Sequence, residues 1–523
     1  MVGYELGVDE CNTVLLGRVR NGASMVGGNF RGRPHYADLY FGLSDAVNEA
    51  RQNPDSFFRS YVNIDDIAGH VVSGTKTFVF GPKGTGKSAL GLWIEADTDE
   101  VVAQVRDATT LPLADIPNLQ TGQSAGVERT VTAWKFILLC NYLALLRRDN
   151  ACEIKNSREV DRVTRLLREF GFMGDASGKA LIKVATTTVE IPIPKIGNIY
   201  KRESKSVLNI FTLIPYLEDW ALSAASPNRH VLFVDGLDSI YLNDAKYDES
   251  LAALVQASYQ LNQRLGAAEA TGSVVLLLRN DVFSRVSLRL PDSQKMRDDL
   301  GVDLDWRILT GAAGANAPLF NLVNAKASAA AGVKINVLDY FPDKISVGRS
   351  HRSIPTMQYL LNLTRHTPRD LLRLFDEIRK VEASEVLGHS RGRHISDNVI
   401  REGVLQYSTK YFVNAIKNEF AGYEGGADAA QDAVTALQYL NSQKFTRADF
   451  KARLGEAKGE AITDREADRL LKLLFFAGAI GNLVGNDSYM RFFHRRDDSE
   501  IYLKGNLILH GTLCHAWNVP FGI

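Results

Sequence analysis

The sequence predicts an α/β protein with a parallel sheet, followed by a helical region and a small C-terminal part of helices and strands. Two continuous apolar segments, at residues 230–234 and 273–278, are typical of strands buried on both faces of a parallel sheet. Helical periodicity at residues 249–265 supplies the crossover that two parallel strands require. A third strand-like segment, at residues 75–80, runs directly into a glycine-rich loop and a helix.

Length and composition limit the function classes. The chain has 523 residues, so at ~150 residues per domain it exceeds one small domain. Lys and Arg number 61, as do Asp and Glu, so no surplus charge draws the chain to nucleic acid or anionic lipid. The four cysteines are scattered and indicate neither a disulfide framework nor a zinc site. We expect no membrane segment and a cytoplasmic location, since the first residues lack the layout of a signal peptide.

Changes in sequence pattern divide the chain into four parts. An N-terminal extension at 1–38 has no clear periodicity, and the core at 39–310 carries the strands, with inserted helices and a hairpin at about 104–205. A helical domain is expected at 311–422. A glycine-rich stretch, EGGAD, marks the start of the last domain, at 423–523.

Within the core, residue type and spacing predict each element. Residues 75–80 are β-branched and aromatic, which favours a strand. A hairpin is predicted where Ile, Val and Thr alternate before Pro192 and Pro194. The sheet is expected to end near residue 285. The other expected elements are a helix at 43–61, turns at 103–126, helices at 130–148 and 157–170, the hairpin at 179–193 and a helix at 210–224.

After the sheet the pattern is helical. A helical stretch is expected around Trp306, and Pro368 stands in the first turn of a later helix, where proline is favoured. Thr446 and Thr463 are typical N-caps, and Glu466 is expected to complete a capping box with Thr463. The expected helices are 319–331, 354–363, 368–381, 398–419, 429–440, 446–454 and 463–477, and a final hairpin pairs 479–484 with 488–494.

The strongest motif is the octapeptide GPKGTGKS at residues 81–88, which fits G-x-x-x-x-G-K-[ST] without departure. Its glycines let the backbone curl so that amide groups and a helix N-terminus face phosphate groups. Lys87 is expected to reach the β and γ phosphates, and the Ser88 hydroxyl to bind Mg²⁺. The motif predicts an ATP and Mg²⁺ site. The expected nucleotide-contacting residues are Gly81, Pro82, Lys83, Gly84, Thr85, Gly86, Lys87, Ser88 and Ala89.

Acidic residues follow the second predicted strand. Asp235 comes directly after four apolar residues, which puts a carboxylate at the end of a buried strand and makes it the expected partner of Mg²⁺. Many hydrolytic P-loop ATPases carry a second acid immediately afterwards, but Gly236 stands there in this chain. Asp238 follows and is a candidate to orient the attacking water, with helix capping as the alternative interpretation.

Several arginines are candidates for contacts to phosphate. Arg279 ends the strand at 273–278 and is a candidate γ-phosphate sensor, with a surface ion pair as the alternative. The adjacent Asn280 is a second candidate for that role. Arg369, in the first turn of a helix, is expected to close over the phosphates. The candidates for an arginine finger to a neighbouring subunit are Arg285, Arg289 and Arg297, although solvated charge is the favoured interpretation of each.

Five segments together carry a resemblance to a known group of proteins. FGLSDAVNEAR, FVFGPKGTGKSAL, VLFVDGLD, VVLLLRNDVF and TPRDLLRLF, within about residues 39–380, resemble a poorly characterised family of bacterial P-loop ATPases related to origin-recognition-like AAA+ and STAND ATPases. The resemblance implies a P-loop NTPase sheet domain, a helical lid and a C-terminal winged-helix domain at about 429–495. It also implies that Asp235 and Asp238 are Walker B acids, that Arg279 is sensor 1 and that Arg369 is the sensor 2 arginine.

The departures from that family bear on the rate of reaction. The adjacent pair of acids of typical AAA+ Walker B motifs is missing, and sensor 1 is Arg where many AAA+ proteins have Asn. We therefore expect an ATPase that turns over slowly and serves as a switch.

Two functions from different classes follow. The first is an ATP-dependent switch that controls assembly with itself, as a homo-oligomer, or with a separate effector protein, for example as the regulatory ATPase of a bacterial defence system. The alternative is an ATP-dependent DNA-binding protein of origin-recognition type that acts through its winged helix. Residues 401–523 carry as many acidic as basic residues, which disfavours phosphate contacts and favours a protein partner.

Overall fold

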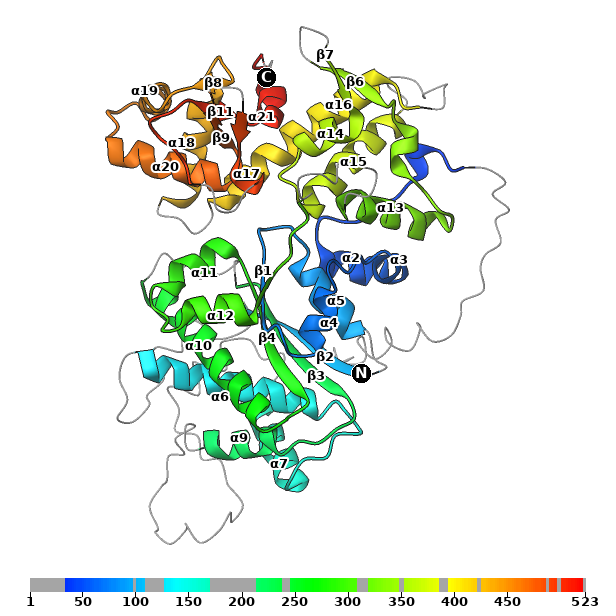
Figure 1. Cartoon of the computed structure of the whole chain (residues 1–523), viewed down its shortest axis with the longest axis vertical. Coiled ribbons are helices and arrows are strands. Elements are labelled where there is room, and N and C mark those ends of the chain that lie inside the picture. The colour runs from blue at the N-terminus through cyan, green and yellow to red at the C-terminus, as the bar shows by residue number, and fades with distance from the viewer. Residues whose placement is uncertain are drawn as a thin grey trace, which may run out of the picture.

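The computed structural model shows a sheet-bearing part, a helical part and a C-terminal part (Figure 1). The described residues are 33–96, 100–108, 127–169, 213–237, 245–307, 318–347, 352–384, 394–420, 425–485, 489–495 and 500–520. The hairpin predicted at 179–193 and Asp238 lie outside these residues, as does most of the predicted N-terminal extension.

A five-stranded sheet forms the centre of the first part. Its order is β2-β3-β4-β1-β5, and every neighbouring pair of strands is parallel. This arrangement confirms the predicted α/β class with a parallel sheet. The strands are β1 (Phe78–Phe80), β2 (Val101–Asp107), β3 (Arg229–Asp235), β4 (Gly272–Leu278) and β5 (Gly301–Asp303).

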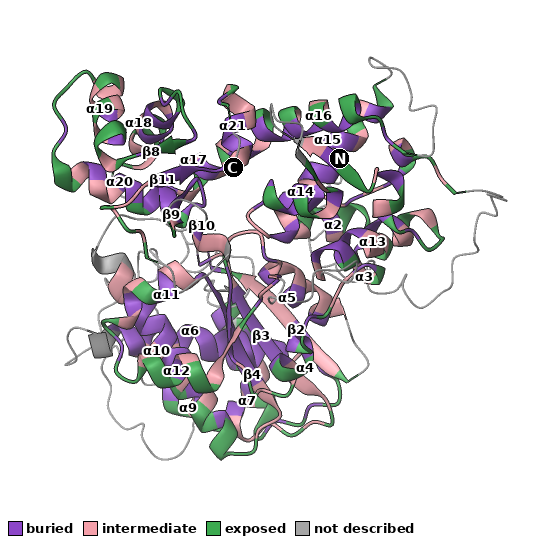
Figure 2. Cartoon of the chain, turned by 45° about the horizontal axis from the view of Figure 1, so that its top comes forward, coloured by how far each residue is buried: buried purple, intermediate pink, exposed green. Residues whose placement is uncertain are grey.

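Helices cover both faces of this sheet because its strands are apolar on both sides (Figure 2). In β1, Phe78 and Phe80 pack on one face, and Val79 packs on the other. The first face is covered by α6 (Val127–Leu146), α7 (Ser157–Glu169), α9 (Ile214–Leu222), α10 (Ala245–Ala267), α11 (Asn280–Ser287) and α12 (Ser293–Leu300). The second face is covered by α4 (Ile67–Val72) and α5 (Lys87–Ala96).

Two strands of this five-stranded sheet were missed by the sequence analysis. β2 occupies the start of the segment that was expected to form turns, and its side chains are mostly half-buried because it is an edge strand with one neighbour. β5 lies beyond residue 285, where the sheet was expected to end, and it pairs over three residues with β1. The helical stretch expected around Trp306 was also wrong, because the described residues 304–307 are not helical.

The segment before the sheet differs from its prediction. The helix expected at 43–61 is two helices, α2 (Ala46–Gln52) and α3 (Pro54–Arg59), because Pro54 starts a new helix. Ahead of them, η1 (Tyr36–Asp38) packs on the helical part, where the Tyr36 hydroxyl donates a hydrogen bond to the Phe375 carbonyl (3.0 Å). This segment therefore ties the helical part to the helices that lead into β1.

The helical part contains the four helices expected between residues 319 and 419, with local differences. Its elements are α13 (Pro318–Ala331), η5 (Val337–Tyr340), β6 (Lys344–Val347), β7 (Arg352–Pro355), α14 (Thr356–Asn362), α15 (Pro368–Ala383), α16 (Asp397–Gln406), η6 (Tyr407–Phe412) and α17 (Val413–Glu419). The β6–β7 hairpin was missed. The single helix expected at 398–419 is present as α16, a π-helical turn and α17 in direct succession.

The C-terminal part has the three helices and the hairpin that were predicted, and a larger sheet. Its elements are α18 (Gly426–Gln438), β8 (Lys444–Phe445), α19 (Arg447–Lys458), α20 (Asp464–Phe476), β9 (Ile480–Val484), β10 (Tyr489–Arg491), η7 (Phe493–Arg495), β11 (Leu507–Leu509) and α21 (Gly511–Trp517). The four strands are antiparallel in the order β10-β9-β11-β8, so β8 and β11 were missed. One hydrophobic cluster joins this part to the helical part.

The two predicted N-caps are both present in this part. Thr463 accepts a hydrogen bond from the Glu466 amide, but the Glu466 carboxylate pairs with Lys458 (2.7 Å). The reciprocal capping box forms instead between Thr446 and Asp449.

No helix among the described residues is long and apolar enough to cross a membrane.

A buried polar cluster stabilises the amino-terminal edge of the sheet. The fully buried His230 at the start of β3 lies 2.9 Å from the Asp149 carboxylate, which also accepts hydrogen bonds from Ser226 (2.6 Å) and Asn228 (3.1 Å). Burial lowers the pKa of His230, against the attraction of Asp149. Burial acts to raise the pKa of Asp149, but these hydrogen bonds outweigh it and lower that pKa.

We expect this cluster to make the protein less stable in acid. The folded state resists protonation of His230, whereas the unfolded chain accepts a proton near the ordinary pKa of 6.5, so stability falls as the pH drops through that value. The measurement is the thermal unfolding midpoint between about pH 8 and about pH 5. The unfolding midpoint of His230→Gln should depend less on pH than that of the wild type, because the variant lacks the titrating group. An equal pH dependence in the two proteins would contradict this assignment.

Candidate functional site

The glycine-rich loop between β1 and α5 forms the centre of the site. Gly84 and Gly86 have φ values of +85° and +98°, a region that residues with a Cβ rarely adopt. The Thr85 hydroxyl donates a hydrogen bond to the Pro82 carbonyl (2.9 Å), and the indole of Trp306 donates one to the Thr85 carbonyl (2.8 Å). The loop is thereby held curled at the N-terminus of α5, as an anion-binding loop requires.

Lys87, the first residue of α5, is folded onto this loop. Its ammonium donates hydrogen bonds to the carbonyls of Gly81 (2.9 Å) and Pro82 (3.1 Å), and the residue is only 8% exposed. The positive charge therefore lies against the loop whose amides and helix N-terminus attract anions.

Two carboxylates stand at the carboxyl edge of the sheet beside the loop. Parallel pairing of β2 and β3 places Asp107 directly opposite Asp235. The Asp235 carboxylate accepts a hydrogen bond from the Gly236 amide (2.8 Å), and a Cβ built on Gly236 would lie 2.5 Å from an Asp107 oxygen. Gly236 thus leaves room for a second carboxylate that comes from the neighbouring strand.

The loop, both carboxylates and Arg369 line one cavity of about 560 Å³. This volume is within the roughly 300–1,000 Å³ range of small-molecule sites. The cavity is bounded by the sheet-bearing part, the helices before it and the helical part. Its lining includes Leu43, Ser44, Val47, Glu49, Tyr61, Val62, Lys83, Gly84, Thr85, Gly86, Lys87, Ser88, Ala89, Asp107, Asp235, Trp306, Leu322, Lys326, Arg369 and Leu372.

Away from the loop, the lining includes apolar side chains and one buried ion pair, together with polar residues such as Ser44, Ser60 and Glu95. Leu322 and Leu372 come from the helical part, and Tyr61 from the segment before β1. The Lys326 ammonium lies 2.8 Å from the Glu49 carboxylate, and both residues are at most 5% exposed. Burial lowers the pKa of Lys326, although the Glu49 charge opposes the shift. The cavity thus combines a cationic, amide-rich end with apolar walls, which suits a phosphorylated ligand with a flat ring.

Arg369 connects the helical part to the loop. It lies in the first turn of α15, and its backbone amide donates a hydrogen bond to the Gly84 carbonyl (3.3 Å). Its guanidinium donates to the Ser44 carbonyl (2.8 Å). The structure therefore brings Arg369, Lys87 and Asp235 to one cavity, as the sequence analysis expected.

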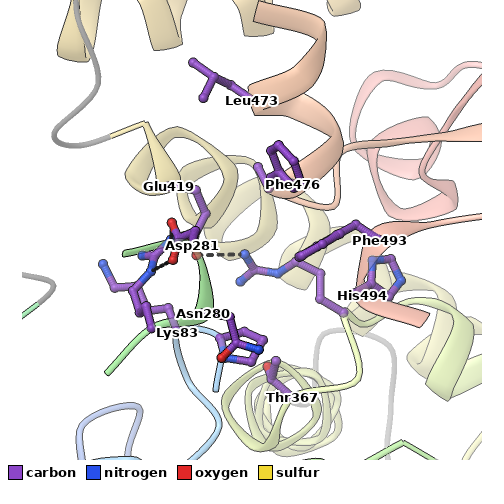
Figure 3. A pocket seen from close by; sticks show the side chains of 13 residues that line it. Lys83, Asn280, Asp281, Thr367, Glu419, Leu473, Phe476, Phe493 and His494 are labelled. Carbon is purple, nitrogen blue, oxygen red and sulfur yellow. Dashed lines mark hydrogen bonds and ion pairs between the residues drawn. The ribbon is translucent and has the colours of Figure 1, made fainter. Parts of the chain in front are cut away.

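Arg279 is placed differently. Its guanidinium donates two hydrogen bonds to the Asp281 carboxylate (both 2.9 Å) and lies 2.9 Å from Glu419 of α17. It lines a second, smaller pocket, which Pro82 and Lys83 of the loop also line (Figure 3). Arg279 therefore lies next to the phosphate loop but is not among the residues that line the larger cavity. Asn280 lines the smaller pocket too, and its amide is 3.4 Å from Asp303.

The three candidates for a finger arginine differ in their surroundings: two are paired with acidic residues and one is exposed. Arg285 lies 2.9 Å from Asp248, and Arg297 lies 2.8 Å from Asp303 and covers the Phe80 ring. Arg289 is exposed just after α11. Of the three, Arg289 has the placement that a contact to another subunit would need.

Three residues of this region were missed by the sequence analysis. Asp107 was overlooked because β2 was expected to form turns, although Ala103 and Val105 alternate with the polar Gln104 and Arg106 as in a half-buried strand. Trp306 was assigned to a helix, and its contact with the loop depends on β5. Glu419 ends a helix that sequence periodicity predicts, but nothing local indicates its partners.

The residues present fit a hard divalent cation held together with phosphate oxygens. Asp107, Asp235 and the Ser88 hydroxyl supply oxygen atoms, which Mg²⁺ prefers. No group of three or more His, Cys, Asp or Glu side chains able to hold a metal occurs among the described residues. This agrees with Mg²⁺ chemistry, in which one or two carboxylates act together with substrate phosphates.

We expect Gly84→Ala to disrupt the site. The new methyl group would lie 2.9 Å from the Arg369 Cβ, at a φ that alanine tolerates poorly. The loop and α15 would have to separate, so affinity for a nucleoside triphosphate should fall about tenfold or more. Titration of the full chain with a fluorescent nucleotide measures this loss.

Gly266→Ala is the matched control. Gly266 lies in α10, and a Cβ there would meet nothing within 4 Å, so neither nucleotide affinity nor folding should suffer. Equal affinities in the two variants would show that the approach of α15 to the loop does not matter for binding.

In comparisons with known proteins, no protein-family model and no curated protein matches this chain. The chemistry of the cavity is therefore the basis for inferring a function.

Proposed function

We propose that this protein is an ATP-dependent switch, which binds Mg²⁺-ATP in the large cavity and hydrolyses it slowly. The observation that carries the proposal is that residues 83–88 of the loop, Asp235 of the sheet-bearing part and Arg369 of the helical part line the same cavity. This combination supplies a phosphate-binding loop with its lysine, a carboxylate for Mg²⁺ and an arginine from the lid side, which are parts of the machinery for phosphoryl transfer. The apolar walls would hold the base.

In this proposal each residue has a separate role. The loop amides and the N-terminus of α5 bind the phosphates, and Lys87 exchanges its bonds with the Gly81 and Pro82 carbonyls for bonds with phosphate oxygens. Ser88 and Asp235 hold Mg²⁺, with Asp107 as an additional carboxylate. Bound Mg²⁺ neutralises charge on the transferred phosphoryl group. Asp238 orients the attacking water.

Two observations support slow turnover. Gly236 stands where many hydrolytic ATPases have a second acid, so no general base immediately follows Asp235. Arg279 is bound by Asp281 and Glu419, so it must leave Glu419 before it can reach a γ-phosphate. Slow hydrolysis leaves each nucleotide state populated long enough to control assembly.

The helical part serves as the lid in this proposal. Arg369 contacts the loop through a backbone hydrogen bond and lines the cavity, so α15 has the position from which to sense the phosphates. A ligand that contacts both parts favours their closed arrangement only to the extent that it binds the closed arrangement more tightly than the open one. Lid closure would then determine which surfaces are available to a second copy or to an effector protein.

The proposed winged helix is α18, α19 and α20 with the β9–β10 hairpin. Asp464 and Asp468 of α20 pair with Arg447 of α19 (3.3 Å for Asp464). The three basic residues of α20 are matched by three acidic ones, so this helix has no net positive charge for DNA. Leu473 and Phe476 of α20, together with Arg469 and Lys472, line a groove of about 840 Å³ opposite α11 and α12. The balanced charge and the apolar side chains in the groove favour a protein-directed role over the DNA-binding alternative.

Loss of the Lys87 charge tests the proposal directly. Lys87→Ala should weaken ATP binding about a hundredfold, because it removes a charge-assisted contact to the phosphates. Calorimetric titration with ATP and Mg²⁺ measures the affinity. Lys76→Ala is the matched control, since Lys76 is half-buried just before β1, donates to the Asp299 carbonyl (2.9 Å) and does not line the cavity. Equal binding by both variants would disprove the proposed site.

The switch itself predicts a change of mass in solution. The full chain should gain mass with a non-hydrolysable ATP analogue but not with ADP, and Lys87→Ala should abolish the gain. Mass photometry without nucleotide, with ADP and with the analogue measures it. A mass that is constant in all three conditions would contradict self-assembly and leave an effector protein as the partner to isolate.

Asp238→Asn separates hydrolysis from binding. If Asp238 orients water, hydrolysis should slow about a hundredfold while ATP affinity stays within about twofold. Phosphate release under saturating ATP is the measurement. Asp219→Asn, at an exposed acid paired with Lys155, serves as control. Unchanged turnover in Asp238→Asn would remove this residue from the mechanism.

A further inference from the structure

Glu419 joins two arginines that come from different parts of the chain. It is the last residue of α17, and one carboxylate oxygen lies 2.9 Å from the Arg279 guanidinium at the end of β4. The other oxygen lies 3.2 Å from Arg365, just before α15. The Glu419 and Arg279 side chains are 11% and 8% exposed, so the contact is largely withdrawn from solvent. Figure 3 shows Glu419 beside Asp281 in this pocket.

The Arg365 side of this cluster is held rigidly. Both oxygens of the fully buried Asp370 accept hydrogen bonds from the Arg365 guanidinium (2.8 and 2.9 Å), and the Tyr411 hydroxyl donates a third (2.8 Å). Burial acts to raise the pKa of Asp370, but Arg365 outweighs it and holds that pKa below its ordinary value. Arg365 therefore stays charged and in place, and Glu419 retains a cationic partner if Arg279 moves.

The Arg279 side has room for an exchange of partners. Arg279 follows β4, the neighbour of the strand that carries Asp235, and it shares its pocket with Pro82 and Lys83 of the phosphate loop. Asp281 belongs to the same helix start and moves with it. Lys83 lines both the Arg279 pocket and the nucleotide cavity, so it lies between the guanidinium and that cavity.

We propose that Glu419 is a positioning residue that holds Arg279 out of the nucleotide cavity, and that a γ-phosphate competes with Glu419 for this guanidinium. The proposal rests on the proposed ATP site and names its control element. The γ-phosphate of a bound triphosphate reaches Arg279, whereas a bound diphosphate leaves Arg279 paired with Glu419. The buried guanidinium has an anionic partner in each state, which avoids the large cost of an unpaired buried charge.

The exchange has a consequence for the C-terminal part. Glu419 ends the helix that leads into that part, and residues of α20 and η7 line the same pocket as Arg279. Release of Arg279 removes the ion pair between this helix and the sheet-bearing part. The identity of the bound nucleotide is thereby communicated to the part of the chain that follows α17.

The test compares the affinities of the full chain for a non-hydrolysable ATP analogue and for ADP. Glu419→Gln removes the competing charge, so the ratio of ATP-analogue affinity to ADP affinity should rise about tenfold. Arg279 keeps Asp281 as a partner in this variant, so the fold should survive. In the double variant Arg279→Ala with Glu419→Gln, the ratio should return to that of Arg279→Ala alone.

Glu377→Gln is the matched control for loss of a buried, doubly paired carboxylate. Glu377 is 5% exposed and lies 2.9 Å from both Arg373 and Lys380, but all three residues belong to α15. This variant should leave the affinity ratio unchanged, whatever it costs in thermal stability.

The outcomes separate this proposal from the one on which it rests. The restraint on Arg279 is disproved if Glu419→Gln leaves the affinity ratio at the wild-type value. It is also disproved if Glu419→Gln raises the ratio by the same factor in the Arg279→Ala background. A parallel loss of both affinities with a lower unfolding midpoint would show a purely structural role and overturn it as well. If wild-type protein binds neither nucleotide, the ATP site itself fails.

Discussion

Parallel strand pairing is the constraint on which the rest of this structure depends. Because β1 lies between β4 and β5, and β3 lies between β2 and β4, the carboxyl ends of all five strands meet at one edge. Residues separated by more than a hundred positions in the chain thereby reach one another. The glycine-rich loop follows β1, Asp235 ends β3, and Asp107 ends β2 in register with it.

The contact between the sheet-bearing and helical parts is polar where it meets this edge. A backbone hydrogen bond joins Arg369 to Gly84, and an ion pair joins Glu49 to Lys326. The helical part is joined to the C-terminal part through one continuous hydrophobic cluster, to which Ile64 and Trp306 also belong. Polar contacts exchange partners at lower cost than apolar packing, so any movement between the sheet-bearing part and the helical part is expected to change the polar contacts at this edge first.

Charged side chains at the carboxyl edge of the sheet extend beyond those that line the cavity. Arg279, Glu419 and Arg365 form a chain of ion pairs next to the loop, and the buried Asp370 neutralises its far end. Buried ion pairs contribute little net stability compared with apolar packing, but breaking one side is costly. Such a cluster is suited to discriminate between two arrangements of the chain, because each arrangement must provide a partner for every buried charge.

The sequence by itself determined the local features of this protein. The octapeptide at 81–88, the two buried strands and the helices of the C-terminal half follow from residue type and periodicity, which depend on neighbours in the chain. Asp235 and Arg369 were identified because each stands at the end of such an element. Only the tertiary structure decided the pairing of β2 and β5, the position of Asp107 opposite Asp235, and the partners of Arg279. Edge and three-residue strands are stabilised by neighbours far away in the chain, and ion pairs between elements leave no periodic trace, so these features required the folded chain.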